Sequence, residues 1–337
     1  MLTIEEIEAA CDASQTLDFS RDETLEVPEL SLREMFYPLG FPAEVRTNSA
    51  EILSELTKIW GIFEKKFDTE PMQVDVHVIE GDGSECPPTP TYRLMKPFMM
   101  TVADNYNYVV ADLSQNKTQA TLSTTALRHK LYLRYFLLEP MVGHHIATRH
   151  ATPVHGGSVA LDGQGVVLLG DSGAGKSSLS YACARAGWTY IADDASFLLN
   201  GGSLRIVVGN CHQVRFRPTA SELFPEIEEL AITPRAAGKP SIEMPMASMP
   251  HIVCAPTAHV DYLVFLNRRT GGRSELLPYR KDVARSFMRQ VLFGLPETIA
   301  AQYQAIDRLL AADVFELRYS DLNWAIERLQ TLVRQGR

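Results

Sequence analysis

A glycine-rich segment at residues 170–177 carries the most specific chemical signal in the sequence. It reads Gly-Asp-Ser-Gly-Ala-Gly-Lys-Ser, which is a complete G-x-x-x-x-G-K-[ST] phosphate loop. Glycines let such a loop wrap until its backbone N–H groups point at phosphate oxygens, and the N-terminus of the following helix adds favourable partial charge. The predicted nucleotide-binding residues are the loop and the position after it: Gly170, Asp171, Ser172, Gly173, Ala174, Gly175, Lys176, Ser177 and Ser178.

The residues on either side supply the context that this motif needs. The apolar run 165–169 predicts a buried strand, and the segment from Lys176 to Ala186 predicts a helix that stops at Gly187. Within the loop, Lys176 would reach the β- and γ-phosphates, and the Ser177 hydroxyl would hold Mg²⁺. We therefore expect ATP, or another nucleoside triphosphate, together with Mg²⁺, rather than a glycine-rich turn without a ligand.

Two adjacent carboxylates, Asp193 and Asp194, follow the next predicted strand, residues 188–192. One helix and one strand form a right-handed βαβ step, which places the second strand in the same parallel sheet as the first. Ligands of such sheets bind beyond the carboxyl ends of the strands, so we expect both carboxylates near the γ-phosphate. One would help to hold Mg²⁺, and the other would orient or deprotonate an attacking hydroxyl. The alternative is that the pair only forms the turn that ends the strand.

A histidine, His155, precedes a Gly-Gly pair and a predicted hairpin over residues 158–169. That hairpin would carry the imidazole back towards the phosphate loop, which favours a catalytic role. A single histidine at the start of a strand is also commonly structural. The two interpretations therefore stay open.

Taken together, these residues resemble the catalytic domain of bacterial HPr kinase/phosphorylase and its HPr-kinase-related relatives. The resemblance is carried by His155 with Gly156, by residues 165–177 and by residues 192–194, in residue type and in spacing. It is weaker over residues 315–322, which are similar to the closing strand and helix of those kinases. The N-terminal third of the chain takes no part in it.

The resemblance implies a role for each matching position. Asp194 would be the general base towards a serine hydroxyl, with His155 supporting it and Lys176 contacting the phosphates. The implied magnesium ligands are Asp193 and Ser177. The bifunctional enzymes carry a further magnesium-associated glutamate in a glycine-rich signature after the aspartate pair, whereas residues 208–217 here contain no acid. This departure puts the phosphorylase reaction, and HPr itself as the substrate, in doubt.

We expect an α/β protein in two parts. Residues 125–337 would form a P-loop kinase domain on a largely parallel sheet, of the HPr-kinase/PEP-carboxykinase-like type that the resemblance implies. Residues 1–124 would form a smaller α+β region of unknown role. Strands in this region are predicted as a small meander at 73–79, 92–102, 106–112 and 117–123.

Helices are predicted from helical spacing and from capping residues. Two of them run from Thr3 to Ala10 and from Ser49 to Glu64. A third opens at Thr124 or Thr125 and joins the two halves, with a core-facing row made of Leu127, Leu131, Tyr135 and Leu138. The predicted C-terminal helices are 281–293, 297–311 and 321–335.

Composition favours an intracellular enzyme. The chain has 337 residues, 45% hydrophobic and 22% charged, which suits one large or two ordinary folded domains. A net charge of −9 argues against nucleic-acid binding, and no window approaches the roughly 20 apolar residues of a membrane span. The five scattered cysteines fit free thiols in a reducing compartment, and the acidic start lacks the pattern of a signal peptide. We therefore expect a cytoplasmic protein.

Two further segments are weaker candidates. The alternating residues 214–217 predict a half-buried strand whose arginines, Arg215 and Arg217, face solvent in preference to phosphates or an acidic acceptor. Residues 231–250 are rich in Pro, Ala, Gly and Met and would form a flap over the site, with Lys239 as a candidate phosphate contact. An ordinary surface loop is the alternative for that segment.

The predicted function is ATP- and Mg²⁺-dependent transfer of the γ-phosphoryl group to a hydroxyl, with a serine of a protein or peptide as the favoured acceptor. The expected catalytic residues are Asp194, His155 and Lys176. Two alternatives stay open: a small-molecule kinase of the shikimate or gluconate type, and a nucleotide-binding regulatory protein without phosphotransfer. Neither a nucleic acid nor a membrane is expected as a partner, and the oligomeric state, a homo-oligomer included, stays open.

Overall fold

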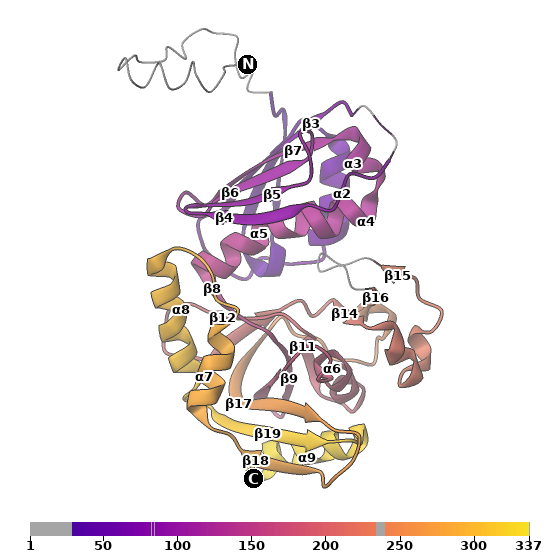
Figure 1. Ribbon diagram of the computed structural model, residues 1–337, viewed down its shortest axis with the longest axis vertical. Helices are drawn as coiled ribbons and strands as arrows, with labels where there is room; N and C mark the ends of the chain where they lie inside the picture. Colours follow the sequence, from indigo (N-terminus) through magenta and orange to yellow (C-terminus); the bar gives the residue numbers. More distant parts are fainter. Residues whose placement is uncertain (1–28, 82, 84, 234–239, 337) are drawn as a thin grey trace, which may run out of the picture.

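The computed structural model describes residues 29–336 apart from residues 82, 84 and 234–239. Within this part of the chain, a first sheet with its helices lies next to a second, larger sheet with its own helices, along the long axis of the molecule (Figure 1). The fold is therefore mixed α/β, as expected. The predicted helix from Thr3 to Ala10 and the candidate Lys239 lie outside the described residues.

The first sheet holds seven strands in the order β1-β2-β3-β7-β6-β5-β4. Strands β4 to β7 follow one another as antiparallel neighbours, which confirms the predicted meander over residues 92–123, but including residues 73–79 in it is wrong, because β3 pairs with β7 in parallel. The predicted strand 92–102 is two strands, because the chain reverses at Lys96 and Pro97. The strand bounds are β1 (Leu32–Phe36), β2 (Ala43–Thr47), β3 (Met72–Ile79), β4 (Thr91–Met95), β5 (Phe98–Val102), β6 (Tyr108–Asp112) and β7 (Lys117–Ser123).

Helices cover one face of this sheet. Ser123 opens the helical segment after β7, since its side-chain oxygen accepts the backbone N–H of Ala126. The segment breaks at His129, whose φ of −98° and ψ of 71° are not helical. The bounds are η1 (Pro38–Gly40), α2 (Ala50–Trp60), α3 (Thr124–Arg128), α4 (Lys130–Tyr132), the π-helical turn η2 (Leu133–Leu138), α5 (Glu139–His145) and a second π-helical turn η3 (Ile146–His150).

The break at His129 shifts which residues of this segment face the core. Leu127, Tyr135 and Leu138 are buried as expected, but Leu131 is 45% exposed. The prediction for Leu131 is wrong because the helical phase restarts after His129, so that the fully buried Leu133 takes its place.

The helical segment after residue 124 packs against both halves of the molecule. Leu133, Leu137 and Met141 share a buried cluster with strand residues of the first sheet, and Val208 of the second sheet belongs to the same cluster. In Figure 1, α5 accordingly lies between the two sheets. The predicted division between residues 124 and 125 stays a prediction, since the helices after it complete the core of the part before it.

The second sheet is mixed rather than largely parallel. Among the described residues, the neighbours β10, β17 and β19 run parallel to one another, and the other strand pairings within this sheet are antiparallel. The prediction was wrong because short hairpins join many of the strands; β9 and β10, for example, are linked by only Asp162 and Gly163. The strand bounds are β8 (Ala151–Val154), β9 (Gly156–Leu161), β10 (Gln164–Leu169), β11 (Thr189–Ala192), β12 (Ser196–Leu199), β13 (Ile206–Gly209), β17 (Thr257–Arg268), β18 (Glu275–Pro278) and β19 (Asp313–Tyr319).

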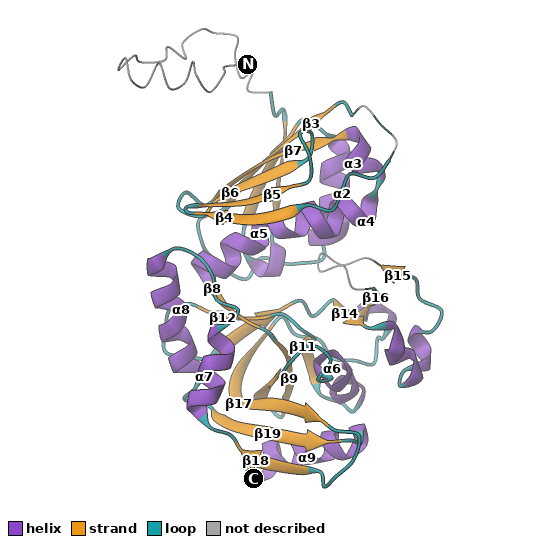
Figure 2. Cartoon of the chain, viewed as in Figure 1, coloured by secondary structure: helices purple, strands orange, loops and turns teal. Residues whose placement is uncertain are grey.

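Helices cover both faces of the parallel strands (Figure 2). Val166 and Leu168 of β10 pack towards α6 and α9, whereas the alternate residues Val167 and Leu169 pack towards α7 and α8. A small third sheet, β14-β16-β15, flanks this layer. The remaining bounds are α6 (Lys176–Arg185), β14 (Gln213–Phe216), η4 (Pro218–Glu222), η5 (Pro225–Ile227), β15 (Ile232–Thr233), β16 (Ser241–Pro245), η6 (Met246–Ser248), α7 (Lys281–Arg289), α8 (Pro296–Leu309) and α9 (Leu322–Gln335).

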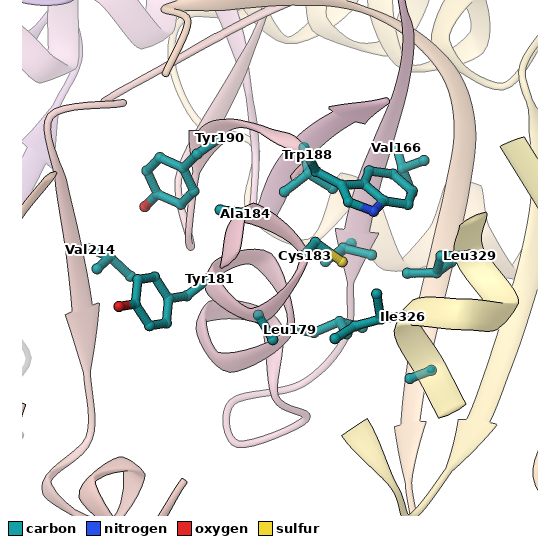
Figure 3. Close-up of a cluster of buried hydrophobic side chains, with 14 of the residues drawn as sticks. Val166, Leu179, Tyr181, Cys183, Ala184, Trp188, Tyr190, Val214, Ile326 and Leu329 are labelled. Atoms are coloured by element: carbon teal, nitrogen blue, oxygen red, sulfur yellow. The ribbon is translucent and has the colours of Figure 1, made fainter. Parts of the chain in front are cut away.

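The helix that follows the phosphate loop is held on nearly every side. Figure 3 shows Leu179, Tyr181 and Cys183 of α6 among the side chains of neighbouring elements. Trp188, which follows this helix, is fully buried beside it. Helix α6 is therefore a rigid support for the loop at its N-terminus, because close-packed interiors resist displacement.

The shifted helical phase gives a direct test of the fold. We expect Leu133→Ala to lower the free energy of unfolding by about 2–5 kcal/mol, because it empties a fully buried position. The matched control, Leu131→Ala, removes an exposed side chain and should change it by no more than about 0.5 kcal/mol. Urea unfolding measures both values. Equal losses in the two variants would show that the segment is packed in a different phase.

Candidate functional site at the phosphate loop

Strand direction brings the predicted residues to one edge of the second sheet. Strands β10 and β11 are both antiparallel to β9, which lies between them, so they run in the same direction. The phosphate loop after Leu169 and the acid pair after Ala192 therefore leave the sheet at the same edge. Gly156, the first residue of β9, pairs with Leu169, so His155 lies at this edge as well.

The loop adopts a conformation that depends on its glycines. Gly173 and Gly175 have φ values of 95° and 99°, a region that residues with side chains rarely occupy. A Cβ atom at Gly175 would lie 2.5 Å from the hydroxyl oxygen of Tyr319, at the end of β19. That hydroxyl donates a hydrogen bond to the Ala174 carbonyl at 3.1 Å, so β19 supports the loop from outside.

The side chain of Lys176 is turned back under the loop. It is only 5% exposed, and its Nζ donates to the carbonyl of Gly170 at 2.8 Å and to that of Asp171 at 3.3 Å. Burial lowers the pKa of the ammonium, and the neighbouring Asp194 opposes this shift. The ammonium is thus fixed against the phosphate loop by main-chain oxygens.

The Asp194 carboxylate joins the other two predicted catalytic groups. Its Oδ1 atom lies 3.6 Å from the Nζ of Lys176 and 3.6 Å from the Nε2 of His155. The carboxylate is partly exposed, so a bound molecule can reach it. The residues predicted from three separate segments are therefore within contact distance of one oxygen atom.

These groups face a cavity of about 670 Å³. The predicted residues that line it are His155, Ser172, Gly173, Gly175, Lys176, Ser177, Ser178 and Asp194. The other loop residues, Gly170, Asp171 and Ala174, line a second cavity of about 470 Å³, which also borders Gly173. The volume of the first cavity lies within the range of roughly 300–1,000 Å³ that is typical of small-molecule sites.

The two aspartates occupy different surroundings. Asp193 lines a third cavity of about 230 Å³, which Asp194 also lines and to which Trp60 and Phe63 of the first half contribute. The Oδ2 atom of Asp193 accepts the backbone N–H of Arg215 in β14 at 2.9 Å. The two carboxylates are thus not equivalent, and the magnesium role of Asp193 stays a prediction.

The Gly-Gly pair after His155 has a structural reason. A Cβ atom at Gly157 would lie 2.2 Å from the Oγ of Ser180 and 2.8 Å from the backbone oxygen of Asp193. Only glycine leaves room there for the acid-bearing turn and for helix α6 against β9. The pair therefore sets how close the carboxylates can come to the loop.

The first half of the molecule contributes residues to the site that were not predicted there. Tyr135 and Glu139, from η2 and α5, line the 670 Å³ cavity. Arg268, at the end of β17, borders it too. Helical spacing marks Tyr135 as a core-facing position but not as a site residue, and no motif marks Glu139 or Arg268, because all three meet the loop only through tertiary packing.

Arg215, in β14, contacts two carboxylates and an aromatic ring. Its guanidinium donates to Glu139 at 3.1 Å and to Glu243 at 3.0 Å, and it lies 4.8 Å from the centre of the Tyr135 ring. The side chain is only 17% exposed, so the prediction that Arg215 faces solvent is wrong. The reason is that both carboxylates come from distant segments, which a local pattern cannot reveal.

A second arginine completes this partly buried charge cluster. Arg134 contacts Glu139 at 2.9 Å and Glu243 at 2.9 Å, so two guanidinium groups balance two carboxylates. Burial alone would raise the pKa of Glu243, but Arg215 and Arg134 hold it below its ordinary value. The cluster joins α5 and η2 of the first half to β14 and β16 of the second.

A further cation lies directly at the loop. Arg217 is exposed, as predicted, but its Nη2 donates to the Oγ of Ser172 at 2.8 Å. Together with Lys176, Arg215 and Arg268, it gives the 670 Å³ cavity four cationic side chains, against three carboxylates, those of Glu139, Asp194 and Glu222. Such a concentration of positive charge suits a polyanionic ligand.

No helix in the described part of the chain is long and apolar enough to pass through a bilayer. No family model matches the sequence, and no curated protein matches it. Among solved structures, the chain is similar to the Hpr(Ser) kinase/phosphatase from Coxiella burnetii, at 14% sequence identity and a TM-score of 0.32. The match covers 55% of this chain and 96% of that one. The likeness is distant in sequence and in shape.

The charge cluster predicts how stability depends on pH. We expect Arg215→Met to lower the free energy of unfolding by about 1–3 kcal/mol at neutral pH, because it leaves Glu139 and Glu243, which are partly buried, to share the guanidinium of Arg134. Since Arg215 helps to hold the pKa of Glu243 below 4.5, this stabilisation is present above that pH and is lost as pH falls. The difference between variant and wild type should therefore be smaller at about pH 4 than at pH 7. Urea unfolding at the two pH values measures it.

The control for this experiment is Arg33→Met. Arg33 pairs with Glu44 on an exposed strand, where an ion pair contributes at most about 1 kcal/mol. A loss at Arg215 no larger than that at Arg33, or one independent of pH, would contradict the stabilising role of the cluster.

Proposed function

We propose that this protein is a phosphotransferase that moves the γ-phosphoryl group of ATP to a hydroxyl, with the serine of a protein or peptide as the favoured acceptor. The observation that carries the proposal is the position of the Asp194 carboxylate, 3.6 Å from the ammonium of Lys176 at the edge of the phosphate-loop cavity. A carboxylate held there can accept a proton from a hydroxyl that attacks a phosphate bound in the loop.

The transfer would proceed in line. The acceptor oxygen would form a bond to the γ-phosphorus as the bond to the oxygen bridging the β- and γ-phosphates breaks, and ADP would leave. Asp194 would orient the hydroxyl and take its proton. Lys176 would stabilise negative charge on the phosphates, and His155, 3.6 Å from the same carboxylate oxygen, would hold Asp194 in position.

The loop residues would hold the triphosphate, and Ser177 and Asp193 would hold its metal. Positive φ angles at Gly173 and Gly175 shape the cradle, and the cationic side chains around it match the charge of the phosphates. Hydroxyl and carboxylate oxygens of the kind that Ser177 and Asp193 carry are the ligands that Mg²⁺ prefers. When bound, Mg²⁺ would neutralise part of the negative charge that develops on the transferred phosphoryl group.

The kind of molecule that receives the phosphoryl group distinguishes a protein kinase from a small-molecule kinase and from a protein that only binds the nucleotide. Purified protein would be incubated with γ-labelled ATP and cell extract, and the products separated by size. Label in polypeptides supports a protein kinase, whereas label in small metabolites alone supports a small-molecule kinase. A tight ATP complex without label transfer to any fraction would support a nucleotide-binding regulatory protein instead.

The role of Asp194 can be tested by a single substitution. We expect Asp194→Asn to lower the rate of phosphotransfer by at least about 100-fold, because the amide cannot take the proton. Affinity for ADP should stay within about threefold of wild type, since the phosphates are bound by the loop. Rates from labelled transfer and affinity from calorimetry are the two readouts.

The matched control is Asp162→Asn. Asp162 lies in the turn between β9 and β10 and pairs with Arg334 on the surface, so both readouts should match wild type. Equal loss of transfer and of ADP binding at Asp194 would contradict its role as the base.

A further inference from the structure

A second cavity beside the phosphate loop plays no part in the chemistry proposed above. Its volume is about 470 Å³, and it is bordered by four residues of the loop, by the end of β17, by Glu316 in the middle of β19, and by Tyr279 and Phe287. It shares Gly173 and Arg268 with the 670 Å³ cavity, so the two meet along the loop. A ligand that occupies the loop can therefore extend from one cavity into the other.

The order of strands decides which end of a nucleotide this cavity would receive. The acid pair follows β11, which lies on one side of β10, whereas β17 lies on the other side. If the γ-phosphate faces Asp194, the rest of the nucleotide must run away from β11. Strands β10, β17 and β19 are parallel, so their carboxyl ends open on the same edge, where the cavity lies.

Three of the residues that line this cavity are aromatic: Tyr279 and Phe287 are partly exposed, and Phe265 is buried against them. The rings of Phe265 and Tyr279 are stacked, with centroids 4.7 Å apart and an interplanar angle of 25°. The ring of Phe287 meets Phe265 edge-on at 5.4 Å. Flat aromatic surfaces next to a phosphate loop suit a flat heteroaromatic ligand, because nucleobases stack on such rings.

The polar end of the cavity presents hydrogen-bond acceptors. Asn267 donates to the Oε1 of Glu316 at 2.6 Å, and Arg318 donates to its Oε2 at 3.0 Å. These contacts outweigh burial and lower the pKa of Glu316, so its carboxylate stays ionised and only accepts hydrogen bonds. It therefore favours a ligand edge that carries N–H donors, such as the exocyclic amine of a purine.

We propose that the cavity formed by Phe265, Tyr279, Asn267 and Glu316 binds the purine base of the nucleotide whose phosphates occupy the loop. The proposal rests on nucleotide binding at the loop and not on phosphotransfer. The base stacks on the aromatic wall and its amine faces Glu316, while Arg268 lies where the chain of phosphates and sugar passes between the cavities.

Binding of two ligands to the full chain tests the assignment. Calorimetry would compare ADP with inorganic tripolyphosphate, which has phosphates but no base. In Tyr279→Ala we expect ADP to bind at least about fivefold more weakly, because a stacking ring is lost, and tripolyphosphate to bind as in wild type. Tyr279→Phe keeps the ring and should bind both ligands as wild type does. Tyr303→Ala, which removes a half-exposed ring on α8, is the control.

Two results would overturn the assignment. They are unchanged ADP binding in Tyr279→Ala, and an equal loss of affinity for ADP and for tripolyphosphate in that variant. Each leaves the phosphate loop as a binding site, and so leaves the proposed function standing. A wild type that binds neither ligand would remove both the base site and the proposed function.

Discussion

The 3.6 Å separation between the Lys176 ammonium and the Asp194 carboxylate is the constraint on which the proposed chemistry depends. Each of these two groups is also held in place by contacts other than the one between them. Main-chain carbonyls anchor the lysine under the loop, and the aspartate follows a strand whose distance from the loop is set by β9 between them. Gly157 allows that distance to be short, because any side chain there would collide with the turn that carries the acids.

A second set of contacts ties the site to the first half of the molecule. Arg215 donates its backbone N–H to Asp193 and its guanidinium to Glu139 and Glu243. One residue therefore connects the acid-bearing turn with helix α5, which packs under the first sheet. We infer that the N-terminal half contributes to the shape of the site, although it carries no residue of the phosphate loop.

Much of the site could be predicted from the sequence, because its key residues belong to short motifs with fixed local geometry. The strand, loop and helix around residues 170–177 follow from glycine placement and apolar periodicity, and the hairpin after His155 brings the imidazole back as expected. The charge cluster around Arg215 could not be predicted, since its carboxylates lie 76 and 28 residues away along the chain. The mixed sheet was missed because periodicity does not reveal strand direction, and Leu131 because one non-helical residue changes the phase.

A crystal structure with Mg²⁺ and a non-hydrolysable ATP analogue tests the central claim most directly. The account predicts that the γ-phosphate lies between Lys176 and Asp194, with the carboxylate facing the side opposite the bridging oxygen. A nucleotide bound elsewhere, or a γ-phosphate in the loop with the Asp194 carboxylate turned away from it, would contradict the account.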